Sequence, residues 1–120
     1  MRIAVASQNF RTVTAHAGKA RRFILFDAKA DQPVEAGRLE LPRELMLHDF
    51  NGDGPHPLDQ VDVVIAASAG PGFARKMAAR GVLTSIAQHA DPLTAVRLFL
   101  VDGPVAPPTG QLGRCSCGAR

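Results

Sequence analysis

The apolar stretch 61–67 (VDVVIAA) restricts the fold of this 120-residue chain more than any other feature. Both faces of the stretch are apolar, which is typical of a strand that is covered on both sides of a sheet. Residues 68–72 (SAGPG) then form a predicted turn, and 71–80 a helix with proline in its first turn. A second apolar strand at 82–86 completes a strand–helix–strand unit, so we expect these two strands to be parallel.

The first half of the chain predicts strands of a different kind. Residues 2–6 (RIAVA) and 22–28 (RFILFDA) are short and apolar, and 34–41 (VEAGRLEL) partly alternates as a half-exposed strand does. Together these segments favour a meander of antiparallel strands. Asp91 and Pro92 fit the N-cap and first turn of a second helix. The expected class is therefore α/β, with a mixed five-stranded sheet (three antiparallel, then parallel strands) and flanking helices.

Length and cysteine spacing suggest the domain organisation. A chain of this size has room for one core, which we place in residues 1–102 as a single α/β domain. Residues 103–120 are rich in proline and glycine and are predicted to form a tail. Cys115 and Cys117 are one residue apart and cannot crosslink distant parts of the fold. No apolar run approaches the roughly 20 residues of a membrane span, so we expect a cytoplasmic protein without a membrane partner.

The turn at 68–72 is the strongest local indication of a binding site. It follows a buried strand and opens a helix, where free N–H groups and the helix dipole favour an anion. Gly70 and Gly72 let a ligand approach the backbone closely. A tight connection without a ligand explains the same residues equally well. The dinucleotide fingerprint and the phosphate-loop Gly-Lys-Ser/Thr are both missing, which disfavours a nucleotide enzyme.

The segment between Phe10 and Phe26 carries basic residues and no acidic one. A patch of one sign raises the local concentration of ions of the opposite charge, which favours an anionic ligand. A solvated loop is the alternative. The chain has no Trp or Tyr to stack on bases, so nucleic acid is disfavoured. The residues concerned are Arg11, His16, Lys19, Arg21 and Arg22.

Three groups of side chains are candidates for binding a metal. His16 lies in a predicted loop, and imidazole is a ligand for iron, zinc and copper; a solvent-facing histidine is the alternative. Cys115 and Cys117 are soft thiolates that suit zinc, copper(I) or iron–sulfur clusters, but two ligands cannot complete a tetrahedral site. His48 and His56 flank an acidic, glycine-rich stretch that lacks the spacing of a calcium loop.

The positions of the acidic residues disfavour catalysis. A two-metal hydrolytic site needs several carboxylates at strand ends, but the first strand contains none. Asp62 stands at the start of the 61–67 strand, which is the wrong end for the turn at 68–72. No spacing indicates a Ser-His-acid set, and His89, before the second helix, is expected to be structural. We therefore expect that the protein is not an enzyme.

Four segments taken together resemble one family: 1–7 (MRIAVAS), 13–20 (VTAHAGKA), 22–27 (RFILFD) and 61–80 (VDVVIAASAGPGFARKMAAR). They are similar to the dinitrogenase iron–molybdenum cofactor biosynthesis family, which includes NifX, NafY and the C-terminal domain of NifB. The resemblance implies a ribonuclease H-like fold. It also implies that the protein binds iron–molybdenum cofactor or iron–sulfur precursors during nitrogenase maturation, without turnover of its own.

The family's His-Phe-Gly loop and glycine-rich turn correspond to residues 16–18 and 68–72, and Ala17 stands where the family has an aromatic residue. In an open sheet a ligand settles beyond the carboxyl ends of the strands, where we expect the end of the first strand, the His16 loop and the turn to meet. The expected cofactor-binding residues are Ser7, Asn9, Arg11, His16, Gly18, Lys19, Arg21, Ser68, Ala69, Gly70 and Gly72. The expected metal ligands are His16, Cys115 and Cys117.

The leading hypothesis is a non-catalytic carrier of an iron–sulfur or iron–molybdenum cluster, or of a precursor, that works with nitrogenase assembly proteins. One alternative is a metal-free module that binds a small phosphorylated or carboxylate metabolite at the 68–72 turn. Another is a domain that only contacts a protein partner. The sequence leaves the oligomeric state open, although an exposed strand edge at 34–41 would permit dimerisation.

Overall fold

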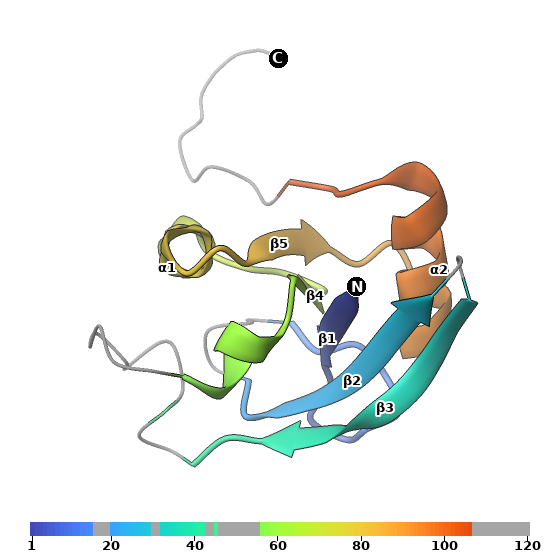
Figure 1. Cartoon of the computed structure of the whole chain (residues 1–120), viewed down its shortest axis with the longest axis horizontal. Helices are drawn as coiled ribbons and strands as arrows, with labels where there is room; N and C mark the ends of the chain where they lie inside the picture. Colours follow the sequence, from blue (N-terminus) through green and yellow to red (C-terminus); the bar gives the residue numbers. More distant parts are fainter. Residues whose placement is uncertain (16–19, 30–31, 43–44, 46–55, 107–120) are drawn as a thin grey trace.

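The computed structural model of the chain describes residues 1–15, 20–29, 32–42, 45 and 56–106. In this part of the chain five strands form one sheet in the order β3-β2-β1-β4-β5 (Figure 1). The strands are β1 (Arg2–Ala6), β2 (Arg22–Lys29), β3 (Gln32–Glu40), β4 (Val63–Ala66) and β5 (Leu83–Ile86). The helices are the 3-10 helix η3 (Pro57–Gln60) and the α-helices α1 (Pro71–Ala79) and α2 (Pro92–Asp102).

Strand β1 is central, and the direction of pairing changes at it. It pairs antiparallel with β2 and parallel with β4, and β5 continues the parallel half. Strands β2 and β3 pair antiparallel on the other side. The predicted α/β class with a mixed five-stranded sheet and flanking helices is therefore confirmed. The ribonuclease H-like assignment stays a prediction.

Each α-helix covers one face of the sheet. Successive side chains of a strand point to opposite faces, so the apolar residues of β1 and β4 divide into two cores. The core under α1 contains Ala4, Ala6, Val64, Ala66, Phe73 and Met77, together with Leu58 of η3. The core under α2 contains Ile3, Val5, Val63, Ile65, Ala95, Val96 and Phe99.

The observed boundaries of two strands, β3 and β4, differ from the predicted ones. Strand β3 begins at Gln32, two residues early, because an edge strand tolerates Pro33 without an N–H group. Strand β4 is shorter than the predicted 61–67: the N–H of Val61 closes η3, and the N–H of Ala67 bonds outside the sheet. The helical turn expected near residues 57–60 is confirmed as η3.

The described chain after α2 turns back beside β5 (Figure 1). The N–H of Ile86 donates to the carbonyl of Val105 at 2.8 Å, and the N–H of Val105 donates to Oγ of Ser85 at 2.9 Å. Val105 is thus bonded to the sheet edge. Residues 107–120 lie outside the described part, and the domain boundary at 102 stays a prediction. None of the described helices is long and apolar enough to span a membrane.

Candidate functional site

The loops that follow β1 and β4 lie together at the carboxyl edge of the sheet. The two strands are parallel neighbours, so both end at this edge. Beyond their ends, Thr14 takes the place of a strand partner: its N–H donates to the carbonyl of Ala6 at 2.7 Å, and its carbonyl accepts from the N–H of Ala67 at 3.0 Å. The β1 exit loop (residues 7–15) is therefore joined directly to the start of the 68–72 turn, as the hypothesis of a shared site requires.

Ser7 and Asn9 shape the β1 exit loop. The hydroxyl of the buried Ser7 donates to the carbonyl of Thr12 at 2.7 Å. Oδ1 of Asn9 accepts from the N–H groups of Arg11 and Thr12 at 2.8 and 2.9 Å, which closes an Asx turn. Both side chains were predicted to contact cofactor, and both bond within the loop.

Phe10 is a feature of this loop that the sequence analysis missed. Its φ is +59°, in the left-handed region that a bulky residue rarely enters. Two guanidinium groups lie over its ring, with Arg22 at 5.7 Å and Arg38 at 4.7 Å from the ring centroid. Such cation–π contacts contribute roughly 0.5–1 kcal/mol each at exposed sites, enough to offset the strain of one residue. No sequence signal links Phe10 to Arg38, which is contributed by β3.

The predicted cations on either side of residues 16–19 differ in their surroundings. Arg11 is exposed on the β1 exit loop. Arg21 is half-buried, and its Nε donates to the carbonyl of Leu41 at 3.0 Å. Arg22 forms an ion pair with Glu40 at 3.4 Å, so part of its charge is neutralised. Cofactor binding by Arg11 and Arg21 stays a prediction.

The 68–72 turn ends in an open helix N-terminus. Ser68 and Gly72 are half-buried, Ala69 is buried, and Gly70 is the exposed N-cap of α1 with extended backbone. Gly70 has no side chain to cap the helix, and the first turn of α1 contains no acidic residue. The positive end of this helix dipole is therefore not balanced by a carboxylate of its own first turn. This end of α1 adjoins the junction at Ala67.

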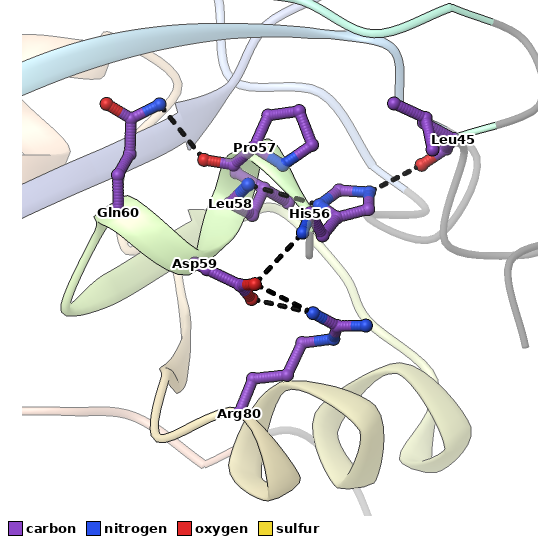
Figure 2. A network of polar contacts seen from close by, with 7 residues as sticks. All are labelled: Leu45, His56, Pro57, Leu58, Asp59, Gln60 and Arg80. Carbon is purple, nitrogen blue, oxygen red and sulfur yellow. Dashed lines mark hydrogen bonds and ion pairs between the residues drawn. The ribbon is translucent and has the colours of Figure 1, made fainter. Parts of the chain in front are cut away.

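His56 is a structural cap, as Figure 2 shows. The ring is buried; Nδ1 accepts from the N–H of Leu58 at 3.1 Å, and Nε2 lies 2.7 Å from the carbonyl of Leu45. The N–H of His56 in turn donates to Oδ2 of Asp59 at 2.9 Å, which completes a capping box for η3. Both ring nitrogens are occupied, and the other residues of the metal site considered at 48–56 lie outside the described residues.

Asp59 also ties η3 to the C-terminal end of α1 (Figure 2). Nη1 of Arg80 lies 2.8 and 2.9 Å from the two carboxylate oxygens of Asp59. The hydrogen bond from Arg80 is the main cause that lowers the pKa of Asp59, and the N–H of His56 lowers it further. This network stabilises the fold on the α1 side, away from the carboxyl edge.

His89 lies in the loop between β5 and α2. Its Nδ1 accepts from the N–H of Asp91 at 3.0 Å. Nδ1 is thus occupied as an acceptor within the loop. This geometry agrees with the structural role expected for His89.

Five of the predicted site residues lie outside the described part of the chain: His16, Gly18, Lys19, Cys115 and Cys117. Within residues 1–15, 20–29, 32–42, 45 and 56–106, no three His, Cys, Asp or Glu side chains gather as a metal site would require. The described residues supply backbone, hydroxyl and cationic groups at the carboxyl edge. Metal ligation by His16 and the two cysteines stays a prediction.

Known structures with a similar fold come from proteins of low sequence identity. The crystal structure of PH0822 aligns with 87% of this chain and 94% of its own, at 16% identity and a TM-score of 0.65. A provisionally assigned dinitrogenase of Methanocaldococcus jannaschii covers 90% of this chain and 97% of its own, at 10% identity and a TM-score of 0.68. A provisionally assigned NifB protein from Thermotoga covers 85% and 88%, at 17% identity and a TM-score of 0.50.

These likenesses establish a shared fold. No curated protein matches the sequence significantly. The model of the family described as dinitrogenase iron–molybdenum cofactor matches residues 1–100, which include every described strand and most of α2. The match covers the β1 exit loop and the 68–72 turn, the two segments that Thr14 joins. The chain therefore belongs to the dinitrogenase iron–molybdenum cofactor family.

Proposed function

We propose that this protein binds an iron–sulfur or iron–molybdenum cluster, or a precursor of one, and carries it to nitrogenase assembly proteins without catalysing a reaction. Family membership supports a role related to this cofactor. The names of two fold relatives, a provisionally assigned dinitrogenase and a provisionally assigned NifB protein, point the same way. The proposal includes a cytoplasmic location and the ribonuclease H-like fold that the family resemblance implies.

The observation that carries the proposal is the junction at Thr14. It holds the β1 exit loop against the 68–72 turn, so the uncapped N-terminus of α1 and the loop that bears Arg11 share one edge of the sheet. Iron–sulfur clusters with thiolate or organic-acid ligands are anionic. Cationic side chains and a helix N-terminus offset such charge, and glycine backbone allows close approach.

The ligands proposed for the metal come from sequence. His16 follows Thr14 by two residues in the chain, and we propose it as the main protein ligand. Cys115 and Cys117 are proposed to assist capture or release of the cluster, because soft thiolates exchange iron–sulfur species. Gly18 and Lys19 are proposed to complete the cationic loop beside His16.

An anaerobic titration tests this proposal. Isolated iron–molybdenum cofactor and a chemically reconstituted [4Fe–4S] cluster are titrated into the full chain and followed by visible absorption and by electron paramagnetic resonance. We expect saturable uptake of at least one of them by the wild type, and a loss of about tenfold or more in affinity for His16→Asn. His89→Asn is the matched control, because asparagine keeps an acceptor for the N–H of Asp91 and removes an imidazole at the same edge. Equal affinity in the two variants would exclude His16 as the ligand.

Removal of residues 107–120 tests the cysteines in the same titration. This truncation leaves the bonds of Val105 to β5 intact, so the sheet edge is preserved. Slower uptake or transfer is expected if the thiolates take part. The carrier proposal would be overturned if the wild type bound neither cluster but gained thermal stability with an organic anion such as citrate. That result would favour a metal-free module.

A further inference from the structure

Gln8 makes an unusual set of bonds for an exposed residue. Its Oε1 accepts from the N–H groups of Arg21 and Arg22 at 2.9 and 3.0 Å. Both partners are backbone donors, so the atom between them must be the amide oxygen. Its own N–H donates to Oγ1 of Thr14 at 2.8 Å, and its carbonyl accepts from Nη1 of Arg22 at 3.1 Å. One residue thus bonds the chain on both sides of residues 16–19.

The two sides have different roles in the fold. On one side, Thr14 joins the ends of β1 and β4 through the carbonyl of Ala6 and the N–H of Ala67. On the other side, Arg21 and Arg22 lead into β2. Gln8 therefore fixes three points at once: the β1 exit, the junction beside the 68–72 turn, and the entry to β2.

We infer that Gln8 is a positioning residue of the binding site, which holds the β1 exit loop and the start of β2 at a fixed separation beside the 68–72 turn. The expected effect of Gln8 on affinity for the cluster rests on the proposed function. Its structural part rests on four hydrogen bonds among Gln8, Thr14, Arg21 and Arg22. Two backbone amides that share one acceptor lose it together, so a single substitution releases both.

The test compares two substitutions of similar size. Gln8→Met removes the acceptor, and Gln8→Glu keeps an oxygen that accepts from both amides. Hydrogen exchange of individual backbone amides is followed by NMR in the full chain, without cluster. For Gln8→Met we expect exchange at Arg21 and Arg22 to rise about tenfold or more, and exchange at Ala67 to rise with it. For Gln8→Glu we expect exchange close to that of the wild type, and for both we expect unchanged exchange at Val64 in the core.

Thr14→Val provides a second variant if Gln8→Met does not fold. It removes the Oγ1 acceptor for the N–H of Gln8 and keeps the bonds to Arg21 and Arg22. We expect faster exchange at Ala67 with unchanged exchange at Arg21 and Arg22. Equal exchange at Ala67 in wild type and Thr14→Val would show that Gln8 does not support the junction, and would overturn the inference.

The affinity for isolated iron–molybdenum cofactor is the second readout. We expect Gln8→Met to bind this cofactor about tenfold more weakly than the wild type does, while the melting temperature of the protein stays the same. Local exchange that rises while affinity stays the same would overturn the positioning role. If the wild type binds no cluster, the proposed function fails, and the exchange rates at Ala67, Arg21 and Arg22 alone decide whether Gln8 holds the loop.

Discussion

The two α-helices begin in opposite ways, although both follow a parallel strand and both have proline in the first turn. Helix α2 is capped by Asp91, whose Oδ2 accepts from the N–H and the hydroxyl of Thr94, each at 2.9 Å. Helix α1 begins at Gly70, which has no side chain to cap it. The bond from the N–H of Thr94 is the main cause that lowers the pKa of Asp91, so α2 carries its own counter-charge.

Both helices cover a core and both begin at the carboxyl edge, so the difference between them is the carboxylate at the N-cap. A capping aspartate is worth about 1 kcal/mol compared with alanine, and α1 has no such contribution at its N-cap. A Cβ at Gly70 would meet nothing within 4 Å, so the position has room for a capping side chain. The absence of one leaves the positive end of the α1 dipole available at the edge where the cluster is proposed to bind.

The largest effect is expected when α1 is given the cap that α2 has. In Gly70→Asp, the new carboxylate accepts from the first turn and adds a negative charge beside the cargo. We expect a gain of a few tenths of a kcal/mol in the free energy of unfolding and a loss of about tenfold in affinity for iron–molybdenum cofactor. Urea denaturation and anaerobic titration measure the two effects, which have opposite signs.

Gly70→Asn is the matched control for charge. Asparagine caps a helix about as well as aspartate but adds no charge. We expect the same gain in stability with only a small loss of affinity. Affinity equal to the wild type in Gly70→Asp would mean that the α1 N-terminus is not part of the binding site.

The second prediction removes the cap from α2. Asp91→Ala should lower the free energy of unfolding at pH 7 by about 1 kcal/mol. The folded-state pKa of Asp91 is lowered, so its contribution is present above its unfolded pKa, about 3.9, and is lost as the pH falls through the lower folded value. The difference between wild type and Asp91→Ala should therefore shrink below about pH 4 in urea denaturation. A difference that persists at pH 2 would contradict a carboxylate cap.

The helix ends were predictable because their signals are local. Asp91 and Pro92 identified the start of α2, and the helix predicted at 71–80 ends beside Gly81, whose φ of +78° suits a residue that follows a helix. Strand β3 was placed two residues late at its start because Pro33 reads as a turn when the edge position of the strand is unknown. Local patterns thus give the elements, and sheet order decides their exact limits.

The sequence predicted that the β1 exit loop and the 68–72 turn lie together, but it did not predict the contacts within the loop. Parallel strands of a sheet end at one edge, so the sequence could locate the loop after β1 and the 68–72 turn together. It could not show that Gln8 bonds both Thr14 and Arg21, or that the ring of Phe10 contacts both Arg22 and Arg38. These contacts join residues 6 to 28 positions apart, and hydrophobic periodicity carries no information about them.

The smallest effect is expected at the other end of α1. At this C-terminal end, Arg80 bonds the carboxylate of Asp59 in η3. The side chain of Arg80 is 15% exposed and that of Asp59 is 38% exposed, so solvent screening limits the pair to at most about 1 kcal/mol. A double-mutant cycle of Asp59→Asn and Arg80→Gln, followed by urea denaturation, measures this coupling directly.

The coupling free energy between Asp59 and Arg80 should also depend on pH. Because the pKa of Asp59 is lowered mainly by the bond from Arg80, the coupling is present above the unfolded pKa of about 3.9 and is lost as the pH falls through the lower folded value. Cluster affinity should stay the same in all three variants, since this end of α1 lies away from the carboxyl edge. A loss of affinity with the Arg80→Gln change would show that the two ends of α1 do not act independently, because the charge at Asp59 would then influence the site through the helix itself.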